Sequence, residues 1–171
     1  MKAYLKNNYT GEETPFKTVL DYGRYDGGLY FNFDCENSQL FSAYDKDNEP
    51  IYRGDVAEIF ICVCGDRRKY FEIEVAPNGT VFFAAIRNEN GLHAKLLDTK
   101  TLQAKVTPRD GGYIAEIKIP FAALGYNGFG EIVFNAYRIE TEGGVPEKNL
   151  LALNPTLCGT FHMPQFFVPL D

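Results

Sequence analysis

The 171-residue sequence contains no tryptophan, only 2 histidines and only 4 cysteines. His93 and His162 give little material for a histidine-based catalytic triad or for a metal site built from several histidines. Four cysteines are too few for a disulfide-rich framework. Cys62 and Cys64 form C-x-C in an extended run, which places them on one face about 6.6 Å apart along the chain, a geometry that does not favour a bridge. We therefore expect the cysteines to be small buried hydrophobic residues.

Long apolar runs, basic clusters and nucleotide-binding or hydrolase motifs are also missing. No apolar run approaches the roughly 20 residues that span a bilayer, and the net charge is −6. An acidic chain without a Lys/Arg cluster argues against nucleic-acid and membrane partners. The N-terminal stretch "MKAYLKNNYTGEETPF" has no apolar signal core. We therefore expect either a cytoplasmic protein or an exported one whose signal has been removed.

The sequence is rich in the residues that favour β-strands. It holds 14 Phe and 11 Tyr, and 45% of its residues are hydrophobic against 23% charged, as in folded chains. Short strand-like runs alternate with turn residues, and the one helical candidate is a single turn over residues 120–125. This pattern predicts an all-β fold, a jelly-roll-like antiparallel β-sandwich forming a single domain over residues 1–171. The expected strands are residues 16–21, 28–33, 56–64, 70–76, 80–86, 102–107, 113–119 and 131–139.

Alternation along two of these strands assigns three glutamates to one face. In "VAEIFICVC" the residues Ala57 and Ile59 share the apolar face, so Glu58 points to the other side. "EVAPNGTVFF" is a hairpin signal around Asn-Gly, and the strand before its turn carries Glu72 and Glu74 opposite its apolar residues. Exposed sheet faces commonly carry Glu, so the first interpretation is a solvated face. A second is a glycosidase pair, because two carboxylates about 5 to 9.5 Å apart are enough for that chemistry.

Five blocks, in order, resemble the family 9 carbohydrate-binding modules and their close relatives. The blocks are "IYRGDVAEIFI", "YFEIEVAPNGTVFFA", "GYIAEIKIPFAALG", "GEIVFNAYRIE" and "LNPTLCGTFHMPQFF". They cover the chain from about Tyr52 to its end, whereas residues 1–45 match only loosely. The resemblance implies a β-sandwich that binds sugar without catalysis, beside polysaccharide-degrading enzymes such as xylanases.

The resemblance also implies site residues. In the family an aromatic, an acidic residue and a strand-opening Glu follow one another, and here these are Tyr52, Asp55 and Glu58. Phe161 matches the second aromatic, which with the first clamps a terminal sugar ring. Pyranose C–H faces lie well on aromatic rings, and an ionised Glu accepts hydroxyl hydrogen bonds. The second-rank contacts implied are Arg53, Glu72, Tyr137 and Arg138.

The sequence departs from the family pattern at several of these positions. Glu72 falls near a position where the family can use Arg, so Arg53 or Arg138 would have to replace that donor. Tyr137 falls where the family can present an amide. Tyr and Phe are smaller platforms than the indoles expected. Some relatives carry structural calcium, but no ligand set can be matched here, so no cofactor is predicted.

The sequence therefore predicts a non-catalytic module for a terminal sugar of a plant-type or other polysaccharide, with a polysaccharide-degrading enzyme as a candidate partner. Two alternatives stay open. One is a small β-sandwich glycoside hydrolase that uses Glu58 with Glu72 or Glu74. The other is an interaction domain with the family-like fold and no sugar site, which the missing Trp favours.

Overall fold

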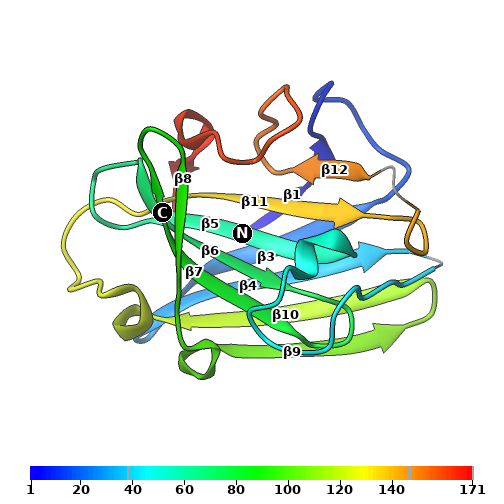
Figure 1. Ribbon diagram of the computed structural model, residues 1–171, viewed down its shortest axis with the longest axis horizontal. Helices are drawn as coiled ribbons and strands as arrows, with labels where there is room; N and C mark the ends of the chain where they lie inside the picture. The colour runs from blue at the N-terminus through cyan, green and yellow to red at the C-terminus, as the bar shows by residue number, and fades with distance from the viewer. Residues whose placement is uncertain (38, 146–147, 171) are drawn as a thin grey trace.

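Two antiparallel β-sheets make up the protein in a computed structural model that describes residues 1–37, 39–145 and 148–170 (Figure 1). The predicted all-β sandwich is confirmed, since the helical elements of the described residues are 3-10 turns of three or four residues. No helix in these ranges is long and apolar enough to cross a membrane.

The smaller sheet has five strands in the order β1-β3-β4-β10-β9. Apolar residues alternate along its two longest strands, so one face is buried against the second sheet. β3 and β4 form a hairpin whose turn includes Gly27 at φ +90°, a conformation that glycine adopts without strain. The strands are β1 Lys2–Tyr4, β3 Thr18–Tyr25, β4 Gly28–Glu36, β9 Gln103–Arg109 and β10 Gly112–Pro120.

The larger sheet has eight strands in the order β2-β12-β11-β5-β6-β7-β8, with β13 paired to β11. The predicted Asn-Gly hairpin is confirmed as the β6–β7 connection, where Gly79 takes φ +89°. The strands are β2 Lys6–Asn7, β5 Val56–Cys62, β6 Lys69–Val75, β7 Val81–Asn88, β8 Leu92–Leu96, β11 Val133–Glu140, β12 Asn149–Ala152 and β13 Val168–Pro169.

The predicted helical turn at 120–125 is confirmed as η3, Phe121–Leu124, which Gly125 ends in the left-handed conformation. Three further 3-10 turns were not predicted. They are η1 Ile51–Arg53, η2 Thr99–Thr101 and η4 Pro164–Phe166.

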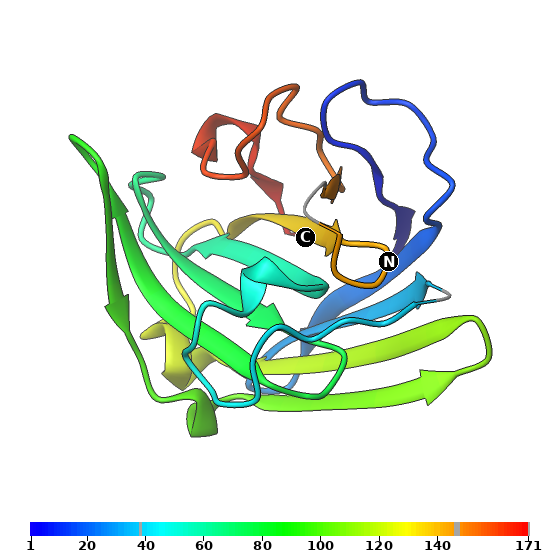
Figure 2. The ribbon, with the colours of Figure 1, turned by 45° about the vertical axis from the view of Figure 1, so that its right-hand side comes forward.

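Apolar side chains are buried on both faces of the larger sheet. The inner face packs against the smaller sheet, and Ile59 and Phe134 belong to this central core. A second cluster on the outer face includes Phe60, Tyr137 and Phe161. The C-terminal segment and η1 lie over this outer face (Figure 2). The outer face is therefore covered around β5, whereas the sequence pattern indicated a solvated face.

The cysteines follow the expectation only in part. Cys35 and Cys62 are buried, but Cys64 is exposed and Cys158 is partly exposed. β5 ends at Cys62, so Cys64 lies just beyond the strand, and both thiols contact the Asp66 carbonyl, at 3.5 and 3.6 Å. All four are free.

Candidate functional site

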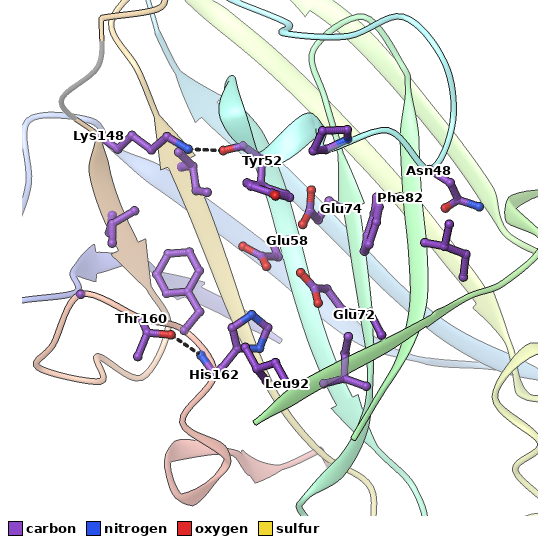
Figure 3. A pocket seen from close by; sticks show the side chains of 18 of the residues that line it. Asn48, Tyr52, Glu58, Glu72, Glu74, Phe82, Leu92, Lys148, Thr160 and His162 are labelled. Atoms are coloured by element: carbon purple, nitrogen blue, oxygen red, sulfur yellow. Dashed lines mark hydrogen bonds between the residues drawn. The ribbon is translucent and has the colours of Figure 1, made fainter. Parts of the chain in front are cut away.

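Three glutamates meet on the outer face of the larger sheet. In the β5–β6 register Glu58 lies opposite Glu74, and Phe60 lies opposite Glu72. Alternation turns all three carboxylates to the same side, where one oxygen of each lies within 4.8 Å of the others. Figure 3 shows the side chains converging from the two neighbouring strands. The cluster thus arises from strand register and alternation alone.

These glutamates are buried, so the expectation of solvated-face residues is wrong. Their exposed fractions are 3% for Glu58, 7% for Glu72 and 0% for Glu74. Oε2 of Glu58 and both carboxyl oxygens of Glu74 have no hydrogen-bond partner within the described ranges. Burial raises the pKa of all three carboxyls, and repulsion from neighbouring glutamates raises the pKa of Glu58 and Glu74 further. In the absence of a ligand the cluster therefore retains protons at a pH where ordinary glutamates are ionised.

The glutamates line a cavity of about 770 Å³. In the register across the sheet, Phe82 of β7 lies beside Glu74, and the apolar residues of β8 extend this wall. Tyr52 of η1 forms the rim above Glu58 and Glu74, and Phe161 and His162 line the cavity from the C-terminal segment (Figure 3). The cavity thus combines acidic groups with aromatic and aliphatic walls, as small-molecule binding sites commonly do.

The two predicted aromatics, Tyr52 and Phe161, line the same cavity. The Tyr52 side chain is 42% exposed. Lys148 donates a hydrogen bond to the Tyr52 carbonyl and lies 5.6 Å from its ring centroid. Phe161 is held by Tyr137, because the two rings stack at 4.2 Å and the Tyr137 hydroxyl donates to the Phe161 carbonyl at 3.1 Å. One aromatic is therefore a rim residue and the other a packed wall.

Asp55 is fully buried and positions the loop that carries Tyr52. Its carboxylate accepts hydrogen bonds from the amide and hydroxyl of Thr141 at 2.8 and 2.7 Å, and from the amide of Phe41 at 2.8 Å. These contacts fix the chain just after η1. Asp55 thus orients the rim without lining the cavity.

Tyr137 and Arg53 are near the cavity but do not line it. Tyr137 is fully buried beneath the Phe161 ring. Arg53 is exposed and donates a 3.3 Å hydrogen bond to the hydroxyl of Tyr44. Of the second-rank residues predicted from the sequence, Glu72 is the one that the structure places in the cavity lining.

Arg138 lies on the opposite side of the sheet from the cavity. It follows Tyr137 on β11, so its side chain points into the sandwich, where it is fully buried. Its guanidinium pairs with Glu140 and donates to Thr18 Oγ1 and to the Glu36 carbonyl, both at 2.8 Å. Arg138 therefore cannot supply the hydroxyl donor predicted for it, because strand alternation directs it to the core.

Solved structures resemble this sandwich over nearly the whole chain. A candidate carbohydrate-binding protein from Bacteroides uniformis ATCC 8492 superposes with a TM-score of 0.79 at 14% identity, covering 99% of this chain and 84% of that one. A family 9 carbohydrate-binding module from Caldicellulosiruptor kristjanssonii in complex with cellotriose gives 0.72 at 16% identity, covering 99% and 80%. The same organism's module in complex with glucose gives 0.69 at 16% identity, covering 98% and 82%.

The chain has a family 9-like fold. No protein-family model matches the sequence, and no curated protein matches it significantly. The structural likeness therefore establishes the architecture alone. A function can be inferred only from the residues that line the cavity.

Within this family 9-like fold, the sequence-based site omitted Glu74, Lys148 and His162. The sequence suggested Glu74 only as a partner in the glycosidase alternative, although alternation places it on the same face as Glu58. Lys148 and His162 come from loops with no local signal. His162 stacks on Phe60 at 5.0 Å and shares a 2.7 Å hydrogen bond with the Tyr70 hydroxyl, and burial lowers its pKa to about 4. His162 is therefore neutral at pH 7.

Proposed function

We propose that this protein is a non-catalytic carbohydrate-binding module that holds a terminal sugar of a polysaccharide in the glutamate-floored cavity. The observation that carries the proposal is the cavity itself, in which Tyr52 and Phe161 line the same space as Glu58. The family 9 modules with this fold include structures in complex with cellotriose and glucose. A polysaccharide-degrading enzyme as partner remains a prediction.

Each group has a chemical role in such binding. The exposed ring of Tyr52 offers a face to pyranose C–H groups, and the edge of the cavity near Phe161 closes the other side. Glu58 and Glu72 are less completely buried than Glu74, and their carboxyls accept hydroxyl hydrogen bonds. Such hydrogen bonds contribute about 0.5 to 1.5 kcal/mol each to a protonated carboxyl and about 1.5 to 3 kcal/mol each to an ionised one.

The placement of the glutamates favours binding over hydrolysis. Glycoside hydrolysis needs two carboxyl groups that flank the scissile bond. Glu58, Glu72 and Glu74 project from two adjacent strands and converge on one point of the cavity floor. A glycosidic bond placed in the cavity would therefore have all three carboxyls on one side.

The test is isothermal titration calorimetry with cellotriose and glucose, together with a glycan array. We expect binding by the wild type and a loss of about 1 to 3 kcal/mol for Glu58→Gln. Tyr52→Ala should weaken binding as well. The matched controls are Phe129→Ala, which removes an aromatic ring that is 81% exposed, and Glu116→Gln, which neutralises an exposed glutamate on the smaller sheet.

Two results would overturn the proposal. If the wild type bound no sugar at millimolar concentration, the interaction-domain alternative would replace it. Turnover of aryl-glycosides that disappears in Glu58→Gln would instead establish a hydrolase.

A further inference from the structure

We propose that the sugar bound in this cavity carries a protonated amine, and that Glu58, Glu72 and Glu74 together bind that ammonium group. This inference rests on the proposed sugar-binding function and specifies the class of sugar. It concerns amino sugars such as glucosamine, in contrast to the neutral sugars seen in the structural neighbours.

Three carboxyl oxygens at the cavity floor lack hydrogen-bond donors from the rest of the described chain. Both oxygens of Glu74 and Oε2 of Glu58 are buried, and no described residue outside the glutamate cluster donates a hydrogen bond to them. A buried carboxyl oxygen without a donor costs free energy, because it has lost its water and gained nothing. A ligand that brings several N–H donors to this point restores those bonds.

The cavity lining contains more acidic than basic side chains. Three glutamates line the cavity, and within the described ranges Lys148 is the only Lys or Arg that lines it with them. Its ammonium already donates to the Tyr52 carbonyl and lies over the Tyr52 ring. His162 adds no charge at pH 7, because burial lowers its pKa to about 4. The acidic cluster therefore lacks full compensation by the protein's own cations.

The spacing of the three carboxyls matches the geometry of an ammonium group. An alkylammonium group has three N–H donors. Three acceptor oxygens that each lie about 2.8 Å from one nitrogen, along three tetrahedral N–H directions, are about 4.6 Å from one another. The three glutamates offer one oxygen each within 4.8 Å of the others. A sugar hydroxyl has one donor, so it can serve only one of these oxygens.

The surrounding walls favour a sugar amine over a bare divalent cation. Calcium takes six to eight oxygen ligands, whereas the cavity lining next to the glutamates is aromatic and aliphatic, with Phe82, Tyr52 and Ile86. A volume of about 770 Å³ also leaves room for a sugar ring beside the amine. Aromatic faces near an ammonium add attraction through their quadrupoles.

The experiment compares three disaccharides that differ only at C2. Calorimetry at pH 7 with a chelator present would titrate cellobiose, fully deacetylated chitobiose and N,N′-diacetylchitobiose. We expect deacetylated chitobiose to bind at least about tenfold tighter than cellobiose, as one charge-assisted contact allows. The acetylated form should lose that gain, because acetylation removes the charge. Only the amine should give a binding heat that changes strongly with buffer, as the carboxyls release protons to receive it.

Variants locate the effect. Glu74→Gln should bring the affinity ratio of deacetylated chitobiose to cellobiose close to one, whereas the control Glu116→Gln should keep the ratio of the wild type. Circular dichroism and urea unfolding would verify that both variants fold.

The outcomes separate this inference from the function on which it rests. Equal affinities for cellobiose and deacetylated chitobiose would overturn the amine assignment and leave carbohydrate binding intact. Absence of binding by all three sugars would overturn both. Methylamine and Ca²⁺ serve as two controls without a sugar ring. The amino-sugar assignment would also be overturned if methylamine bound as tightly as the disaccharide. Binding of Ca²⁺ by the three glutamates in chelator-free buffer would overturn it as well.

Discussion

Glu58 and Glu74 are direct cross-strand partners in the β5–β6 ladder, and both side chains are buried on the same face. Two carboxyls directly opposite each other repel when both are ionised, and burial penalises the charged form further. The cluster also leaves three carboxyl oxygens without a hydrogen-bond partner within the described ranges. The three glutamates therefore lower the stability of the folded protein, as is common for residues in ligand-binding sites.

Replacement of Glu74 by Met should stabilise the protein. Met has a similar length, carries no charge and packs well in irregular apolar space beside Phe82. We expect the free energy of unfolding at pH 7 to rise by about 1 to 3 kcal/mol, because a buried carboxyl without a donor is removed. Urea unfolding measures the change, with Glu116→Met as a control that should stay within about 0.5 kcal/mol. A less stable Glu74→Met protein would mean that the three glutamates form a net stabilising network.

Stability should fall as the pH rises above the ordinary pKa of glutamate. Burial raises the pKa of Glu58 and Glu74 above the ordinary value of 4.5, so the folded state holds protons that the unfolded state has released. The resulting loss of stability begins near pH 4.5 and continues up to the raised pKa values. His162 has the opposite effect on stability, because burial lowers its pKa to about 4 from the ordinary value of 6.5. Its contribution to stability grows as the pH rises from about 4 to 6.5 and is complete above 6.5.

The window above pH 6.5 therefore isolates the glutamates. Urea unfolding from pH 6.5 to about 8 should show a declining free energy of unfolding for the wild type. The slope should be smaller for the double variant Glu58→Gln/Glu74→Gln. A flat or rising profile in the wild type would show that these carboxyls are ionised in the folded protein.

Tyr52 and Phe161 should separate binding from stability. Tyr52 is 42% exposed, so Tyr52→Ala should change the free energy of unfolding by no more than about 0.5 kcal/mol while weakening sugar binding. Phe161 is buried against Tyr137, so Phe161→Ala should cost about 3 kcal/mol of stability. Calorimetry and urea unfolding on the same samples test both statements. Equal stability losses for the two variants would contradict the distinction between rim and wall.

Arg138 should matter for folding and not for sugar contact. Removal of one partner of a buried ion pair leaves the other charge uncompensated and costs about 3 to 5 kcal/mol. We therefore expect this loss for Arg138→Met and a smaller loss for Arg138→Met/Glu140→Gln, in which both charges are gone. Thermal and urea unfolding measure the difference. A larger loss in the double variant would show that the residues act independently.

Much of the fold could be predicted because its determinants are local. Alternation along residues 56–64 predicted that Glu58 lies on the outer face. The Asn78-Gly79 pair predicted the β6–β7 turn. The same alternation, applied along residues 131–139, would have directed Arg138 to the interior beside Phe134. Five strands were not predicted: β1, β2, β8, β12 and β13. Four of them have only two to four residues, which carry no periodicity, and β8 is exposed along its whole length.

The burial of the glutamates could not be predicted from local pattern. An outer face next to solvent and an outer face beneath a loop have the same alternation. The difference comes from Phe161, His162 and Phe167, which reach β5 from about 100 residues further along the chain. Likewise Lys148 meets Tyr52 only through the tertiary fold. Sequence therefore indicated which side chains share a face, and the long-range contacts decided what covers it.

β8 has a mechanical consequence for the cavity. It is the last strand of its sheet, every one of its five residues is exposed, and β7 is its neighbour in the ladder. Little buried area therefore resists its displacement, since local opening costs least where few apolar contacts are lost. Opposite it, Phe161 is braced by Tyr137 and the packed outer cluster. The cavity thus has one firmly packed wall at Phe161 and one weakly held wall at β8. We therefore expect it to accept ligands of different widths above the same three glutamates.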